Sequence, residues 1–386
     1  ISFQNQDNPW TSLESLVQSE GVQANLLISP GDITTWADPV ALEAAWRKLN
    51  ELGGMINAEV VAAATGNHDV TSRPSELEAD NVIRGLNNPT DLFENLKRLS
   101  PPYPVVDHAA SASGDKAHER RIHYFGADYV VIDDKKDYRL VVVNSCGRHT
   151  TIPAEYERGR IAETTLEWLK EYLERIGDQP RKINILLCHH HPVQHEEQRS
   201  GSYDFMQGGQ LLIDALSEHG DWLVIHGHKH QAKLSYGPGA ASAPAVLAAG
   251  SFAALPNDAS FSLRNQFYLV DVSLDMAGGP LKGTIKAWNW FPGGQGWRES
   301  RSPKDGICSG CGFGNRIHPD DFADKISAAC ASKAPVAWAE VVSAVPEILY
   351  VTPKDLGLIG KSLERRHRLS FEKDPEAVIQ ALARMS

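Results

Sequence analysis

Short runs of apolar residues alternate along the chain with longer segments whose apolar side chains recur at helical spacing. The short runs end at glycine, proline or polar clusters, a pattern typical of strands buried on both faces. Four of them cover residues 25–29, 59–65, 183–188 and 221–225. The amphipathic segments predict helices over residues 39–52, 90–99, 161–176 and 209–219. This order, with few hairpin signals in the first half, predicts a mainly parallel or mixed α/β sheet.

A polar motif rich in metal-binding side chains follows each of these four strands. The motifs are Gly31-Asp32, Gly66-Asn67-His68-Asp69, His189-His190-His191-Pro192 and His226-Gly227-His228-Lys229-His230. Because open α/β sheets hold ligands at the carboxyl ends of their strands, we expect these side chains to collect at one edge of a sheet. The mixed oxygen and nitrogen set suits Mn²⁺, Fe, Zn²⁺ or Ni²⁺ better than Mg²⁺ or Ca²⁺. It predicts metal-assisted hydrolysis.

Each motif also has a simpler structural interpretation when it is taken alone. Gly31-Asp32 is typical of a turn, residues 67–69 of an Asx turn or helix cap, and His189-His190-His191 of a solvated polar cluster. The combination, in this order and after four apolar runs, favours the metal site. We interpret His189, His191 and His226 as neighbours that shape or orient the site.

In this combination and order the motifs resemble those of the calcineurin-like metallophosphoesterases, particularly the bacterial members, over residues 25–272. The resemblance implies a four-layer α/β/β/α sandwich with a mixed sheet. It also implies two divalent or trivalent transition-metal ions, with a hydroxide between them that attacks the phosphorus of a phosphoester. The favoured activity is that of a phosphodiesterase.

The resemblance assigns a role to each matching residue. Asp32 would bridge the two metals, and Asn67, His190 and His228 would complete the ligand set of the second metal. His230 would bind the first metal. The catalytic pair would be His68, which would meet the phosphate and its leaving oxygen, and Asp69, which would orient His68.

One part of the family pattern has no counterpart in this chain. The family takes two more ligands for its first metal from an Asp-x-His tripeptide, and none occurs between Ile1 and Asp32. Asp32 and His230 alone would bind the first metal weakly, so we interpret the difference as truncation just after that motif. The alternatives are a phosphomonoesterase and a degenerate phosphate-binding or regulatory module with an incomplete first metal site.

Composition limits the classes of protein that remain. The chain has 386 residues, 42% hydrophobic and 23% charged, which predicts a globular protein with one large domain and an appendage. A net charge of −11 argues against nucleic-acid binding, despite Arg365, Arg366 and Arg368, and favours a small anionic phosphoester as the partner. No apolar stretch reaches the roughly 20 residues that a membrane span needs. The odd number of cysteines, five, predicts a cytoplasmic protein.

The predicted domains are a metallophosphoesterase domain over residues 1–302 and a C-terminal helical appendage over residues 303–386, which could engage a protein partner. Strands are expected at 267–272 and 281–288, and appendage helices at 320–331, 338–344 and 375–385. Segment 71–138 is predicted to be an insertion or cap over the site. In the appendage, an alternative zinc site would use Cys308, Cys311, His318 and Cys330.

Overall fold

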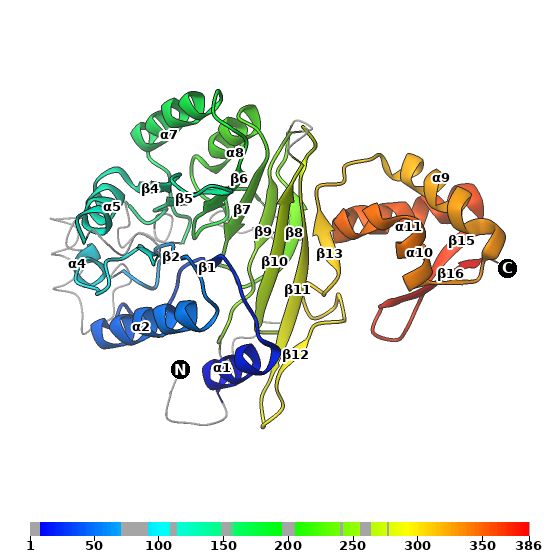
Figure 1. The fold of residues 1–386 in the computed structure, drawn as a ribbon, viewed down its shortest axis with the longest axis horizontal. Helices are drawn as coiled ribbons and strands as arrows, with labels where there is room; N and C mark the ends of the chain where they lie inside the picture. Colours follow the sequence, from blue (N-terminus) through cyan, green and yellow to red (C-terminus); the bar gives the residue numbers. More distant parts are fainter. Residues whose placement is uncertain are drawn as a thin grey trace. The chain divides into compact units, whose positions relative to one another are not determined.

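The computed structural model describes residues 8–70, 92–108, 114–147, 155, 157–194, 205–239, 242–254, 264–275 and 278–385. The chain divides into two compact units (Figure 1). The larger unit comprises Trp10–Lys229 and Gly237–Ala249. The smaller unit comprises His230–Tyr236 and Gly250–Ser386, together with residues 8 and 9.

A mixed sheet in the larger unit confirms the predicted mainly parallel arrangement. Its strands β5, β6, β7 and β9 pair in parallel in that order, and β4 joins β5 in the antiparallel sense. Their bounds are β4 (Tyr129–Ile132), β5 (Tyr138–Val143), β6 (Ile183–Leu187), β7 (Trp222–His226) and β9 (Ala245–Ala248). Every residue of β5, β7 and β9 is buried, and most of these residues are apolar.

A second sheet in the larger unit carries the first two motifs. Strand β1 (Leu26–Ser29) runs parallel to β2 (Val60–Ala63), which pairs antiparallel with β3 (Val105–Asp107). The prediction that all four motifs follow strands of one sheet is therefore wrong for the described residues. An apolar run identifies a buried strand, but it does not specify the neighbour with which that strand pairs.

The helices of the larger unit agree with the sequence in most places. They are α1 (Pro9–Glu20), α2 (Pro39–Met55), α4 (Glu94–Lys97), α5 (Gly114–Ala127), α7 (Glu163–Ile176) and α8 (Gly209–Glu218). Asp38 caps α2 by accepting a hydrogen bond from the Ala41 amide at 2.7 Å. Helices α7 and α8 lie side by side (Figure 1) and bury Leu169 and Leu212 in the core beside the central sheet.

The described part of segment 71–138, whose interpretation as an insertion or cap stays a prediction, contributes strands to both sheets of the larger unit. Residues 71–91 and 109–113 lie outside the described residues. The remainder supplies β3 and β4 to the two sheets, and Tyr103 and Tyr124 are completely buried. Helix α5 escaped prediction because it is strongly polar and buries only Arg120, Tyr124 and Ala127.

In the smaller unit, the predicted strand pair is confirmed as β10 (Gln266–Leu274) and β11 (Leu281–Phe291), which run antiparallel. Strands β12 (Gly296–Glu299) and β13 (Cys311–Phe313) both pair antiparallel with β11. Strand β8 (Lys233–Tyr236) also belongs to this unit.

The C-terminal part of the smaller unit is mainly helical, as predicted, but it also contains a small sheet that the sequence did not predict. Its elements are α9 (Pro319–Cys330), η2 (Ala331–Lys333), β14 (Val336–Ala337), α10 (Trp338–Ala344), η3 (Pro346–Tyr350), α11 (Pro353–His367), β15 (Leu369–Lys373) and β16 (Ile379–Arg384). The sheet order is β14-β16-β15, all antiparallel. The helix predicted over residues 375–385 is strand β16 instead, because pairing with β14 and β15 outweighs its local helical pattern.

The alternative zinc site is also wrong. Among the described residues, the group with metal-binding spacing is His189, His190 and His228. Cys330 packs in the hydrophobic core of the C-terminal domain, and His318 caps the start of α9.

Among the described residues, no helix is both long enough and apolar enough to span a bilayer.

Candidate metal centre

The first two motifs are joined by direct contacts between their backbones and side chains. The His68 amide donates a hydrogen bond to Asp32 Oδ1 at 2.8 Å. A Cβ on Gly66 would lie only 2.1 Å from Asp32 Oδ1 and 2.2 Å from the Asp32 amide nitrogen. Residue 66 must therefore be glycine for the loop to reach the carboxylate.

Gly66→Ala is expected to weaken metal binding and to destabilise the fold, because its methyl group would displace Asp32. Titration with Mn²⁺ and a thermal melt of the metal-free protein would measure the two effects. Gly54→Ala is the matched control, since no atom lies within 4 Å of the place its methyl group would take and Ala is preferred in helix α2 by about 1 kcal/mol. Unchanged Mn²⁺ affinity in Gly66→Ala would contradict the close approach.

The Asp69 side chain stabilises the loop over residues 66–69 through hydrogen bonds to backbone amides. Its carboxylate accepts hydrogen bonds from the amides of Thr34 at 3.0 Å and Gly66 at 2.9 Å. Burial and the nearby charge of Asp32 raise the pKa of Asp69 to about 7, although the two amide bonds oppose this shift. The side chain is 1% exposed, so its role is to hold the loop together.

The expected orienting contact between Asp69 and His68 is corrected by this geometry. His68 Nδ1 lies 2.8 Å from the carbonyl oxygen of Thr35, which can only accept, so Nδ1 carries the hydrogen. The Thr35 carbonyl therefore fixes the ring and leaves Nε2 as its second polar atom. The oxygens of Asp69 are already used by backbone amides of the loop.

His189 lies at the point where the motifs converge. Its Nδ1 donates to the Pro30 carbonyl at 2.7 Å, so its Nε2 faces the other ligand candidates. Nε2 is 3.3 Å from Asp32 Oδ2, 3.2 Å from Asn67 Oδ1 and 3.2 Å from His228 Nδ1. His228 Nδ1 is also 3.2 Å from Asn67 Oδ1. Four potential ligand atoms, one from each motif, therefore meet in one place.

The electrostatics of this cluster favour a positive charge among the four atoms. Burial opposes ionisation of Asp32, but His189 and His68 outweigh it and lower the Asp32 pKa to about 2. Burial and the neighbouring histidines hold the pKa of His228 well below its usual range, so this ring is neutral. Burial also acts to lower the pKa of His189, yet the Asp32 carboxylate reverses that effect and raises it. A carboxylate, an amide oxygen and imidazole nitrogens directed at one point form a donor set that fits a transition-metal cation.

His190 lies beside this cluster and is held by Ser145. The ring Nδ1 of His190 is 2.7 Å from Ser145 Oγ, which also accepts from the His190 amide at 3.2 Å. The potential ligand atoms of His189, His190 and His228 lie within 4.8 Å of one another. His191 and His226 pack ring against ring, with centroids 4.4 Å apart.

The structure thus brings together Asp32, Asn67 and His228 of the predicted set, and it places His190 next to His189 and His228. It adds His189, for which the motifs predicted only an orienting role, although its position directly after β6 was a signal. Ser145, the second residue of an Asn-Ser pair after β5, was not among the predicted site residues. His230 begins a segment of the smaller unit, and its assignment to the first metal stays a prediction.

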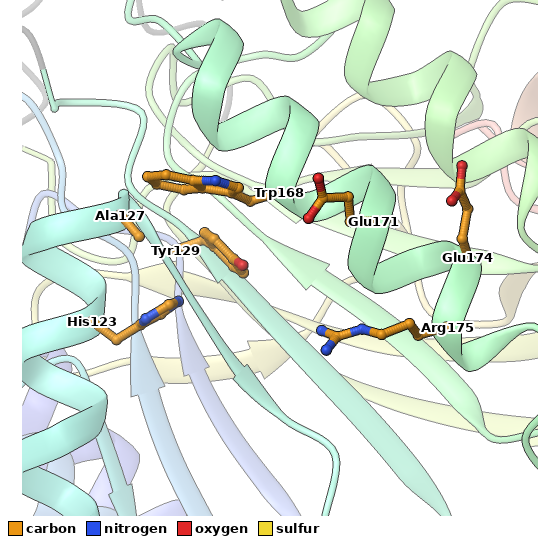
Figure 2. A pocket seen from close by; sticks show the side chains of 7 residues that line it. All are labelled: His123, Ala127, Tyr129, Trp168, Glu171, Glu174 and Arg175. Atoms are coloured by element: carbon orange, nitrogen blue, oxygen red, sulfur yellow. The ribbon is translucent and has the colours of Figure 1, made fainter.

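A cavity of about 640 Å³ opens elsewhere on the larger unit (Figure 2). Trp168, Glu171, Glu174 and Arg175 of α7 line one side, and His123, Ala127 and Tyr129 line the other. None of the candidate metal ligands borders it, so this cavity is separate from the metal centre.

Two family models match the chain. The model described as calcineurin-like phosphoesterase matches residues 5–232, and the model named wHTH-Calcineurin_assc matches residues 311–365. The second match covers most of α9, β14, α10 and α11, whose order fits a winged helix-turn-helix domain. No curated protein was found to match the chain.

Proposed function

The chain belongs to the calcineurin-like phosphoesterase family, whose model covers more than half of it, and we propose that it is a phosphodiesterase acting on a small anionic substrate. Family membership supports metal-dependent phosphoester hydrolysis in general. The observation that carries the proposal is the convergence of Asp32, Asn67, His189 and His228 on one point. We also propose that the protein has the four-layer sandwich of this family and that it is cytoplasmic.

Asp32, Asn67 and His228 would hold one metal, together with His189 or His190. A second metal would share Asp32 and take His230. Manganese, iron, zinc and nickel all suit this mixture of oxygen and nitrogen ligands. When bound, the two cations would neutralise the charge of the phosphoester and activate water for attack on phosphorus.

We propose that His68 acts on the substrate and does not bind the metal. Its ring is fixed by the Thr35 carbonyl through Nδ1, and its amide is bonded to Asp32, so Nε2 is the ring nitrogen left to meet the substrate. This nitrogen can donate a proton to the leaving oxygen, or stabilise negative charge on the phosphoryl group.

His189→Ala is expected to remove metal, because its Nε2 lies within 3.3 Å of three other ligand candidates. The measurement is metal content per chain after dialysis against excess Mn²⁺. His118→Ala is the control, since that histidine is exposed on α5. Full metal content in His189→Ala with loss in His190→Ala would assign the ligand role to His190 alone.

The activity itself is tested with the protein loaded with Mn²⁺ and offered bis(p-nitrophenyl) phosphate and p-nitrophenyl phosphate in parallel. The phosphodiesterase proposal predicts faster turnover of the diester. Faster turnover of the monoester would instead support a phosphomonoesterase. Tight binding of inorganic phosphate without turnover of either compound would support a regulatory module.

The C-terminal domain is proposed to engage a protein partner and not nucleic acid. Arg365 and Arg366 of α11 are already paired with Asp320 and Asp324 of α9, at 2.8 Å in each case. Residues 311–386 also carry ten basic and ten acidic side chains, so the domain lacks the excess positive charge that phosphate contacts require.

A further inference from the structure

Thr65 stands between strand β2 and the Gly66-Asn67-His68-Asp69 motif, and side chains from other segments bind all of its polar groups. Its amide donates to Tyr124 Oη at 3.1 Å, and its hydroxyl is 3.0 Å from the same Tyr124 oxygen. The hydroxyl is also 3.2 Å from Tyr103 Oη. Its carbonyl accepts from Cys146 Sγ at 3.2 Å. Thr65 itself is fully buried.

Tyr124 makes the firmest of these contacts. Its oxygen accepts from the Thr65 amide, which can only donate, and it shares a second hydrogen bond with the Thr65 hydroxyl, in which either oxygen can be the donor. Two bonds to one residue fix both the backbone and the side-chain rotamer of Thr65. Burial raises the pKa values of Tyr124 and Tyr103 far above their usual range, so both phenols keep their hydrogens.

The position of Thr65 makes these contacts relevant to the metal centre. Ala64 is the last residue before the motif whose amide bonds to the backbone of β1, at Ser29. After it, side chains hold the loop: Tyr124 bonds the Thr65 amide, and Asp69 bonds the Gly66 amide at 2.9 Å. Asn67 follows directly, with its Oδ1 at the centre of the ligand cluster.

We propose that Tyr124 is a positioning residue for the metal centre, which acts through Thr65 on the placement of Asn67 and His68. Tyr103 supports the same hydroxyl from its far side. This inference rests on the proposed function and adds a role for α5, which the sequence assigned to a cap. Outer residues that orient ligands are worth about 10–100-fold in metal affinity.

Tyr124→Phe removes both bonds while keeping the ring, and we expect it to weaken Mn²⁺ binding by about 10–100-fold. Thr65→Val removes the hydroxyl but leaves the amide bond, so it should have a smaller effect in the same direction, and Thr65→Ser should restore wild-type affinity. Tyr172→Phe is the matched control, because it also loses the hydrogen bond of a buried phenol, the one to Asp133 at 3.2 Å.

The readouts are calorimetric Mn²⁺ affinity and the melting temperature of the metal-free proteins. A positioning role predicts that Tyr124→Phe and Tyr172→Phe lose similar stability while only Tyr124→Phe loses metal affinity. Equal Mn²⁺ affinity in Tyr124→Phe, Thr65→Val and the wild type would overturn the inference. Failure of the wild type to bind Mn²⁺ would instead overturn the proposed function. If Tyr124→Phe does not fold, the comparison of Thr65→Val with Thr65→Ser decides the question.

Discussion

Asp32→Ala is expected to abolish metal binding and to slow phosphodiester hydrolysis by about 10³-fold or more, since metal stabilisation of the transition state is worth several kcal/mol. Asp32 is the carboxylate in the ligand cluster, 3.3 Å from His189 Nε2. Its loss would leave only neutral ligands, and would also remove the acceptor of the His68 amide. Both the charge that attracts the cation and the loop geometry would be lost.

The measurement for Asp32→Ala is metal content per chain by elemental analysis, with turnover of bis(p-nitrophenyl) phosphate. Asp38→Ala is the matched control, because it makes the same substitution six residues after Asp32. Asp38 caps α2, so its loss should cost about 0.5–2 kcal/mol of stability and leave the metal in place. Retention of both metals by Asp32→Ala would remove this residue from the site.

His68→Ala is expected to keep the metal but to lower kcat by about 10²–10⁴-fold, the usual contribution of general acid catalysis. The ring is fixed by the Thr35 carbonyl, and the ligand cluster contains no His68 side-chain atom. The backbone amide that bonds Asp32 survives the substitution.

A comparison of leaving groups makes the His68 experiment specific. If His68 donates a proton to the leaving oxygen, the rate loss should be larger for an alkyl diester than for a p-nitrophenyl diester, because the better leaving group needs less protonation. An equal loss for both substrates would point to stabilisation of phosphoryl charge instead. Metal loss equal to that of Asp32→Ala would show that His68 is a ligand and not a group that acts on the substrate.

The sequence alone determined the elements that bear the candidate site and most of its proposed ligands. Apolar runs located β1, β2, β6 and β7, and the residues of β2 and β7 are all buried, as expected of strands covered on both faces. Glycine, carboxylate, amide and imidazole residues directly after those strands then identified Asp32, Asn67 and His228. These signals depend only on neighbouring residues in the sequence, so they can be recognised without knowing which strands pair.

Only the tertiary structure decided how these parts meet. The division of the strands between two sheets depends on pairing, which apolar runs of the same pattern do not encode, and pairing also made β16 a strand. The orientation of each adjacent histidine depends on the acceptor that its ring nitrogen finds, and for His189 Nδ1 this acceptor is the Pro30 carbonyl. Asp69 and Tyr124 likewise take their roles from backbone groups of the loop, at positions that sequence spacing does not reveal.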